Sequence, residues 1–336
     1  MSRIAIIGAG AWGTALAIVL GRKSVHHVRL WANEPEVCES IAIDRDNKLF
    51  LPGFILPDSI AATTSLNCAL DAPEIVVSVM PSQYCRRLFE QMAPHLAPKM
   101  LFVSCTKGLE DTTLFRMTEV ITDVLRERRF TPRIAALSGP SFAKEAARGD
   151  PTAVTVASMD GEVTRAVQHA FTDSRFRVYT NDDVAGVELG GALKNIIAIA
   201  AGVCDGLGLG HNSVAALITR GLAEIARLVV ACGGRLDTMA GLAGLGDLVL
   251  TCTGDLSRNR TVGVELGRGR KLPDIIAGMH GAVAEGVFTT RAALGLARKK
   301  NVEMPIIEQI FAILENGKSP EQAIEELMTR AAKSEV

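Results

Sequence analysis

Short apolar runs recur along the first half of the chain, and segments with helical spacing lie between most of them. The runs predict strands at 4–7, 27–31, 60–63, 75–80, 100–105, 133–138, 152–158 and 176–179. The segments between them predict helices at 14–20, 82–92, 112–126, 141–148 and 161–171. Alternation of this kind predicts an α/β fold with a largely parallel, doubly wound sheet and helices on both of its faces.

The strand pattern stops after about residue 181 and helical spacing continues to the end of the chain, interrupted by glycine-rich turns. Near the end, Ser319, Pro320 and Gln322 predict a helix start with a serine cap and proline at the first position. The 336 residues exceed what one hydrophobic core usually supports. We therefore expect a sheet domain over 1–185 and an all-helical domain over 186–336, with a packed cleft between them.

The first predicted strand runs into a turn that contains Gly8, Gly10 and Gly13, in the spacing G-x-G-x-x-G. In a dinucleotide-binding turn, the first glycine permits the tight bend and the second lets the diphosphate approach the backbone. The third glycine lets the helix pack on the strand, and the diphosphate lies at the helix N-terminus, where free N–H groups favour an anion. We therefore expect a nicotinamide or flavin dinucleotide in a Rossmann-type domain over 1–185.

The second predicted strand is followed by Asn33 and then Glu34. An NAD enzyme often has an acidic residue here, which holds the ribose 2′-hydroxyl. Neutral Asn33 neither repels nor strongly attracts a 2′-phosphate, and the nearby basic residues fit solvated surface charges: Arg22, Lys23 and Arg29. The choice between NAD and NADP stays open on these residues.

The composition of the chain limits the classes of partner and ligand that we expect. Hydrophobic residues make up 48% of the chain and charged residues 22%, and the net charge of −1 gives no reason to expect nucleic acid or an anionic membrane. The seven cysteines form no C-x-x-C pair and the six histidines show no ligand spacing, so we expect neither disulfides nor a metal. A strand that starts at residue 4 leaves no room for a signal peptide, and no apolar run is long enough to span a bilayer. A cytoplasmic protein is expected.

Lys194 is the only charged residue between Leu189 and Cys204. A lysine alone on a small, apolar helix either extends its amine to the surface or is held at an internal site. Gly190 and Gly191 lie one turn earlier on its face, and we expect them to leave space for a ligand beside the amine. The spacing alone leaves both interpretations open.

A second candidate region begins at Asp247, a lone carboxylate that follows a glycine-rich stretch and could simply cap a helix. Further on, Ser257 is a candidate cap for a helix whose first turn holds Arg258, Asn259 and Arg260. Cations are unfavourable at a helix N-terminus, but a bound anion reverses that penalty. A small phosphate is the expected guest, and a solvated basic turn is the alternative.

A third set of candidates lies at the ends of two predicted strands. Lys107 follows the strand at 100–105, and Gly139 and Ser141 follow the strand at 133–138. Doubly wound sheets bind ligands at the carboxyl ends of their strands. These residues are therefore candidates to face a nicotinamide and its substrate, although each taken alone fits a structural turn.

Longer motifs, in order along nearly the whole chain, resemble those of the bacterial NAD(P)-dependent sn-glycerol-3-phosphate dehydrogenases. They are G-A-G-A-W-G-T-A-L-A from Gly8, C-T-K-G-L-E from Cys105, L-S-G-P-S-F-A-K-E from Leu137, A-L-K-N-I-I-A-I-A-A-G from Ala192, G-L-A-G-L-G-D-L-V-L-T-C from Gly241, S-R-N-R from Ser257 and V-A-E-G-V from Val283.

The resemblance implies roles for individual residues, and first of all that Lys194 is the catalytic proton acceptor. It implies that the following residues surround glycerol 3-phosphate: Lys107, Gly139, Ser141, Lys194, Asp247, Ser257, Arg258 and Asn259. It implies that the following residues lie along the cofactor: Gly8, Gly10, Ala11, Trp12, Gly13, Asn33, Lys107, Ala143, Arg258, Val283 and Glu285. Family members vary at Ala11, Trp12 and Asn33, so contacts there are expected to be mainly through the backbone.

The implied reaction is the reversible oxidation of glycerol 3-phosphate to dihydroxyacetone phosphate, with NAD or NADP, at the head of glycerophospholipid synthesis. An apolar helix face and neighbouring cations (Lys107 and Arg258) are expected to lower the pKa of Lys194, and Asp247 to oppose that shift. The family also suggests a homodimer. The alternatives are a β-hydroxyacid or 6-phosphogluconate-type dehydrogenase, which has a similar layout, and a non-catalytic NAD(P)H-sensing protein.

Overall fold

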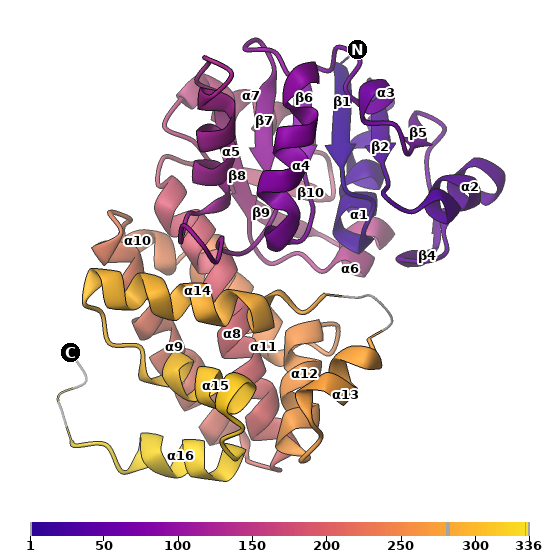
Figure 1. Cartoon of the computed structure of the whole chain (residues 1–336). Coiled ribbons are helices and arrows are strands. Elements are labelled where there is room, and N and C mark those ends of the chain that lie inside the picture. Colours follow the sequence, from indigo (N-terminus) through magenta and orange to yellow (C-terminus); the bar gives the residue numbers. More distant parts are fainter. Residues whose placement is uncertain (1, 280–282, 333, 335–336) are drawn as a thin grey trace.

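A sheet domain and a helical domain lie end to end in the computed structural model, which describes residues 2–279, 283–332 and 334 (Figure 1). The strands of the main sheet are β1 (Ser2–Ile7), β2 (His26–Trp31), β5 (Ile60–Thr63), β6 (Ile75–Ser78), β7 (Leu101–Ser104), β8 (Arg133–Ser138), β9 (Thr152–Ala157) and β10 (Phe176–Asn181). The expected fold class is confirmed: a Rossmann-type sheet is followed by an all-helical part.

The strand order across the sheet is β10-β9-β8-β7-β6-β1-β2-β5. The chain builds outward from β1 in one direction through β2 and β5, and in the other from β6 onward, so the order reverses between β1 and β6. Ligands of doubly wound sheets bind outside the carboxyl ends of the strands at such a reversal. Pairing is parallel from β5 to β8, whereas β9 runs antiparallel to β8 and β10 follows β9.

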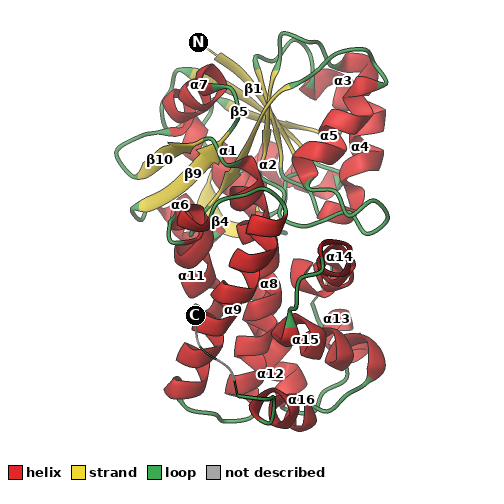
Figure 2. Cartoon of the chain, turned by 90° about the vertical axis from the view of Figure 1, so that its left-hand side faces the viewer, coloured by secondary structure: helices red, strands yellow, loops and turns green. Residues whose placement is uncertain are grey.

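Helices cover both faces of the sheet (Figure 2). They are α1 (Ala11–Gly21), α2 (Pro35–Asp44), α3 (Leu66–Ala69), α4 (Cys85–Met92) with the short 3₁₀ turns η1 (Ser82–Tyr84) and η2 (Ala93–His95) at its ends, α5 (Met117–Arg126), α6 (Ala143–Arg148) and α7 (Gly161–Phe171). Helix α2, helix α3 and the hairpin of β3 (Asp46–Asn47) with β4 (Leu51–Ile55) were not predicted. The helix predicted at 112–126 begins only at Met117, because the Arg116 N–H donates to the Glu119 carboxylate at 2.9 Å and Leu114 is left-handed.

The helical domain is built around α8 (Val184–Gly206), which begins where the strand pattern ends. The others are α9 (His211–Ala231), α10 (Leu236–Met239), the π-helical turn η3 (Leu242–Gly246), α11 (Asp247–Thr253), α12 (Arg258–Gly267), α13 (Leu272–Ala277), α14 (Glu285–Lys300), α15 (Pro305–Asn316) and α16 (Pro320–Met328). Ser319 caps α16 as predicted, since its hydroxyl accepts from the Gln322 N–H at 3.2 Å.

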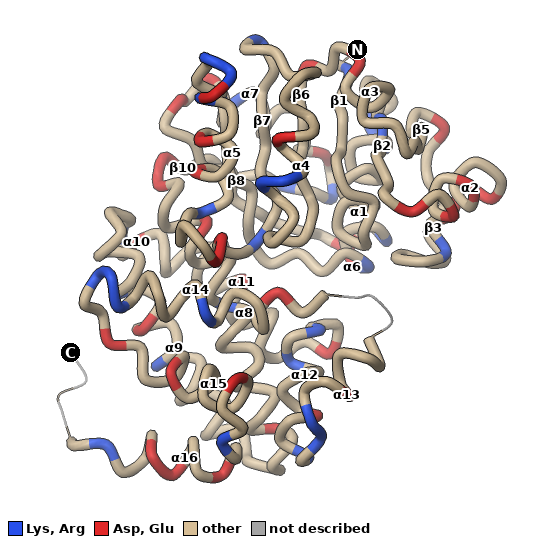
Figure 3. The backbone as a smooth tube through the Cα atoms, viewed as in Figure 1, with Lys and Arg blue, Asp and Glu red and all other residues tan. Residues whose placement is uncertain are grey.

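By length and apolar composition, α8 is the one described helix that could cross a membrane, although Glu188 and Lys194 interrupt its apolar run. Its most apolar window is 94% buried inside the protein, where α9, α11 and α12 pack around it. Figure 3 shows lysine and arginine interspersed with aspartate and glutamate over both domains. The apolar character of α8 therefore goes with its place in the core of the helical domain.

Glycines bring α8 and α12 into direct backbone contact. A Cβ at Gly202 would overlap a backbone oxygen of α12, and a Cβ at Gly263 would overlap one of α8. Gly206 and Gly267 repeat the contact one turn further on, so the two helices run parallel. The first turn of α12 consequently lies beside the turn of α8 that carries Lys194.

A buried carboxylate fastens α8 to the sheet domain. Glu188 accepts hydrogen bonds from the Thr118 N–H at 2.8 Å and from the Thr118 hydroxyl at 2.5 Å, and Arg116 pairs with it at 3.0 Å. Glu188 thus caps α5 from another domain, which is a strong, charge-assisted contact. This link fixes α8 relative to the loop that carries Lys107.

Candidate active site

The glycine turn after β1 has the geometry that a dinucleotide needs. Gly8 has φ +118°, and a Cβ there would overlap the Val79 carbonyl, while a Cβ at Gly13 would overlap the Gly8 carbonyl. Beside Gly10, apart from its neighbours in the chain, none of the described residues comes within 4 Å of the place where a Cβ would stand. Packing therefore requires glycine at Gly8 and Gly13. Gly10 leaves a space open at the N-terminus of α1, and this space fits a diphosphate.

The first turn of α1 supports the same fit. Gly10 is the N-cap of α1, and no side-chain cap hydrogen bond is formed there within the described residues, so the first N–H groups of the helix remain available to an anion. The Trp12 indole nitrogen is buried and has no hydrogen-bond partner among the described residues. Asn33 is exposed just beyond β2, and its amide donates to Glu34 at 3.4 Å.

Lys194 is held inside the protein, so the interpretation of an amine that reaches the surface is wrong. Its side chain is 8% exposed, and its ammonium is hydrogen-bonded to Asp247 and to the Thr251 hydroxyl, the latter at 2.8 Å. Asp247 is 1% exposed and pairs through its other oxygen with Lys107 at 2.7 Å. Three segments far apart in sequence therefore bring two lysines into ion pairs with one carboxylate. Asp247 does not act as a helix cap, since Gly246 is the N-cap of α11.

The charges in this cluster shift one another. Burial lowers the pKa of Lys194 to about 7, Lys107 lowers it as well, and Asp247 opposes the shift, as expected. Burial alone would raise the pKa of Asp247, but the two lysines outweigh it and the pKa lies below its usual value. Because one carboxylate cannot neutralise two ammonium groups, the fully buried lysine is the one that loses its proton most easily.

Gly190 and Gly191 do not leave space for a ligand, and that expectation is corrected. A Cβ at Gly190 would lie 2.6 Å from the Ala243 carbonyl oxygen, and a Cβ at Gly191 would overlap the Ser138 hydroxyl. The two glycines instead let η3 and the end of β8 approach α8. This close approach is what brings Asp247, at the start of α11, to Lys194.

The first turn of α12 lies beside this cluster. Ser257 is the N-cap predicted, and its hydroxyl accepts from the Arg260 N–H at 3.2 Å. Arg258 is exposed and, within the described residues, has no salt bridge; the protein around it lowers the pKa of its guanidinium, and Glu285 opposes that shift. The Asn259 side-chain amide donates to the side-chain oxygen of Asn195 (Oδ1) at 3.0 Å, which ties α12 to the residue after Lys194.

Residues of the sheet domain approach the cluster from the other side. The Lys107 ammonium lies 3.5 Å from the Gly139 carbonyl oxygen, which also accepts from the Ser141 hydroxyl at 3.0 Å. Gly139 has φ +145°, and a Cβ there would crowd Val154, so the turn requires glycine. Ala143 begins α6 directly after this turn.

Glu285 connects the two domains at the start of α14. Its carboxylate accepts from the Ser82 hydroxyl at 2.7 Å and from the Ser82 N–H at 3.2 Å. Burial raises the pKa of Glu285 to about 7, while Ser82 and Arg258 lower it. Val283 precedes this helix and is half-buried, next to residues outside the described part of the chain.

The sequence did not single out Thr251, Asn195, Ser82 or Glu188. Thr251 lies one helical turn after Asp247, and Asn195 follows Lys194 directly, so helical spacing from the candidate residues was the available signal. Ser82 and Glu188 carried no such signal, because their partners lie 203 and 70 residues away in sequence.

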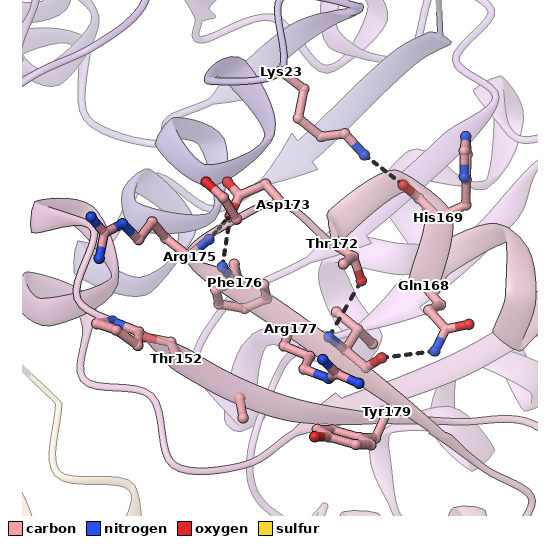
Figure 4. Close-up of a pocket in the computed structure, with 14 residues that line it drawn as sticks. Lys23, Thr152, Gln168, His169, Thr172, Asp173, Arg175, Phe176, Arg177 and Tyr179 are labelled. Carbon is pink, nitrogen blue, oxygen red and sulfur yellow. Dashed lines mark hydrogen bonds between the residues drawn. The ribbon is translucent and has the colours of Figure 1, made fainter.

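A hollow beside β9, β10 and α7 is separate from this cluster (Figure 4). It lies along the free edge of β10, and the polar groups there already bond one another. The Gln168 amide donates to the Val178 carbonyl oxygen at 2.8 Å, and Thr172 accepts from the Val178 N–H at 3.3 Å. Side chains thus occupy edge groups of β10 that another strand could otherwise pair with, and no residue of the candidate site lines the hollow.

Comparisons with known proteins point to one family. The family model of the NAD-dependent glycerol-3-phosphate dehydrogenase N-terminus matches residues 3–164, and the model of its C-terminus matches residues 183–325. Proteins named glycerol-3-phosphate dehydrogenase (NAD(P)+) from Koribacter versatilis and Acidobacterium capsulatum are 69% and 58% identical to the chain, cover all of it, and are themselves covered to 99% and 100%. The solved glycerol-3-phosphate dehydrogenase of Coxiella burnetii is 41% identical with a TM-score of 0.92, over 98% of this chain and 99% of that one.

Proposed function

The chain belongs to the NAD-dependent glycerol-3-phosphate dehydrogenase family, and on that premise we propose that Lys194 is its proton acceptor. The enzyme interconverts sn-glycerol 3-phosphate and dihydroxyacetone phosphate with NAD or NADP. The hydroxyacid dehydrogenase and sensor alternatives are not favoured, because relatives with this name match over the whole chain. The observation that carries the proposal is the buried Lys194–Asp247–Lys107 cluster.

A bound nicotinamide ring supplies the acceptor or donor of the hydride at substrate C2. Lys194, when neutral, takes the proton of the C2 hydroxyl during oxidation and returns it during reduction. Asp247 and Thr251 hold the amine in one orientation, since both bond its nitrogen. Lys107 leaves Asp247 neutralised when Lys194 loses its charge, so the proton can move without an unpaired buried carboxylate.

We assign the phosphate of the substrate to the first turn of α12. Arg258 would bind it through its guanidinium, and Ser257 and Asn259 would lie beside it, with Lys107, Gly139 and Ser141 around the remaining atoms of the substrate. Support comes from an exposed arginine with no salt bridge in the described part of the chain, at a helix N-terminus beside Lys194. Phosphate binding there would position C2 for the transfer.

The dinucleotide is assigned to residues 1–185 and the substrate mainly to 186–336, with the cofactor along Gly8, Gly10, Ala11, Trp12, Gly13, Asn33, Lys107, Ala143, Arg258, Val283 and Glu285. Support comes from the open space beside Gly10 and from the Ser82–Glu285 contact between the domains. The direct test is loss of the near-ultraviolet absorbance of NADH or NADPH on addition of dihydroxyacetone phosphate. A purified, dinucleotide-binding protein without that activity would contradict the function.

The reaction should depend on pH through Lys194. Since its lowered pKa is about 7, kcat/KM for glycerol 3-phosphate oxidation should rise as pH increases through about 7 and then level off. For reduction the lysine must be protonated, so kcat/KM should fall over the same range. Rates from about pH 6.5 to about pH 9.5 avoid the second ionisation of the substrate phosphate near pH 6.

Two variants should move this inflection in opposite directions. Lys107→Met removes a cation that lowers the pKa of Lys194, so the inflection should move to higher pH. Asp247→Asn removes the carboxylate that raises that pKa, so the inflection should move to lower pH. An inflection that stays in place in both variants would mean that another group titrates.

We further propose a cytoplasmic homodimer that supplies glycerol 3-phosphate for glycerophospholipid synthesis. Neighbouring segments of the helical domain leave apolar side chains exposed, among them Val230 on α9, Leu245 in η3 and Val249 on α11. A second copy could cover them, whereas the side chains on the β10 edge disfavour pairing through that strand. Sedimentation that finds only monomer at micromolar concentration would contradict the dimer.

A further inference from the structure

The residues after β2 decide which dinucleotide a Rossmann-type domain prefers, because the adenosine ribose reaches them. Here the polar side chains are Asn33 and Glu34, about 20 residues beyond the glycine turn, as in NAD-binding domains. Glu34 is half-buried, and the Asn33 amide donates to its carboxylate at 3.4 Å. The position thus presents a carboxylate where NADP would bring a phosphate.

Glu34 has no structural task that explains its charge. It is the N-cap residue of α2, but within the described residues its side chain makes no cap hydrogen bond. Burial raises the pKa of the nearby Cys38 thiol, and the charge of Glu34 contributes in the same direction. The carboxylate lies close to the end of β2 and keeps acceptor capacity for a ribose hydroxyl.

The cations around this position are occupied elsewhere. Arg29 pairs with Asp71 at 3.2 Å, and Lys48 pairs with Asp44 at 2.7 Å. Arg45 donates to the carbonyl oxygens of Leu56 at 3.2 Å, Ile60 at 3.0 Å and Pro57. Arg22 and Lys23 also donate to backbone carbonyl oxygens, of Ala147 and of His169 and Ala170.

The neighbouring strand adds no further positive charge. The Ala32 N–H donates to the Thr63 carbonyl oxygen, so the loop after β5 lies next to the end of β2. The sequence contains no lysine or arginine between Lys48 and Arg86, and Arg86 is itself paired with Glu110 and Asp123. A 2′-phosphate would therefore meet Glu34 without a free guanidinium to neutralise it.

We propose that Glu34 makes this enzyme select NAD over NADP, by accepting a hydrogen bond from the adenosine ribose and by repelling a 2′-phosphate. The inference rests on the dinucleotide site of the proposed function and adds the cofactor preference to it. Selection of this kind combines an attractive contact with a repulsive one.

The test measures binding rather than turnover, by titrating the purified enzyme with NADH and separately with NADPH and following nucleotide fluorescence. The unmodified enzyme should bind NADH at least about tenfold more tightly, since hydrogen bonds to a charged group are among the stronger ones. Glu34→Gln keeps the size of the side chain, and it should weaken NADH binding and strengthen NADPH binding, so that most of the preference is lost.

Glu36→Gln is the matched control, because Glu36 is exposed in the first turn of α2 and its loss removes the same charge two residues away. The control should keep the preference. Equal binding of the two nucleotides, tighter binding of NADPH, or an unchanged ratio in Glu34→Gln would overturn the assignment of Glu34. If the unmodified enzyme bound neither nucleotide, the dinucleotide site itself would be overturned with it.

Discussion

Replacing Lys194 by methionine should lower kcat by about 10²–10⁴, the usual contribution of a positioned acid or base. Folding should survive, because methionine keeps an apolar, unbranched chain on α8 and Asp247 retains its pair with Lys107 at 2.7 Å. Binding of NADH should also survive, since the glycine turn lies in the other domain. The measurement is kcat at saturating substrate, after a fluorescence titration has shown that the variant binds NADH.

A lysine that only fills the core would behave differently. Methionine would then leave kcat nearly unchanged and would slightly stabilise the protein, since an ammonium would no longer have to be desolvated. The two outcomes differ by about 3–5 kcal/mol in barrier height, well beyond assay error. A folded, NADH-binding variant with turnover near that of the unmodified enzyme would refute the assignment of Lys194 and move the search for the base to Lys107.

Replacing Arg258 by glutamine should weaken binding of the substrate far more than binding of the cofactor. A truncated charge-assisted contact costs about 2–5 kcal/mol once the bound phosphate has excluded water from it. The increase should appear in KM for dihydroxyacetone phosphate, while the Kd for NADH changes much less. Arg258→Lys should restore only part of the loss, because an ammonium lacks the planar fork of the guanidinium.

Arg260→Gln provides a matched control two residues along the same helix. Arg260 is already paired with Asp205 at 2.7 Å and Asp255 at 3.0 Å, so its loss should leave KM for the substrate unchanged. An Arg258→Gln variant with normal KM for dihydroxyacetone phosphate would show that the phosphate binds elsewhere.

The sequence by itself determined the elements whose signal is local. Apolar runs predicted the strands of the main sheet. The glycine spacing after β1 predicted a tight turn there, and the structure leaves no room for a Cβ at Gly8 or Gly13. Ser257 and Ser319 were predicted as helix caps, and both are. These features depend on the backbone period and on side chains a few residues apart, so a short window of sequence contains all that decides them.

Only the tertiary structure decided how distant elements combine. Strand β9 runs antiparallel to β8. The sequence could not show this, because an apolar run predicts a strand but not the direction in which the strand pairs. Gly190 and Gly191 looked like free space, but η3 and β8 fill it. Asp247 meets Lys194 across 53 residues and Lys107 across 140, because packing of buried surfaces, rather than any local preference, sets those contacts. The buried charge balance of the site, and hence the lowered pKa of Lys194, exists only once those contacts form.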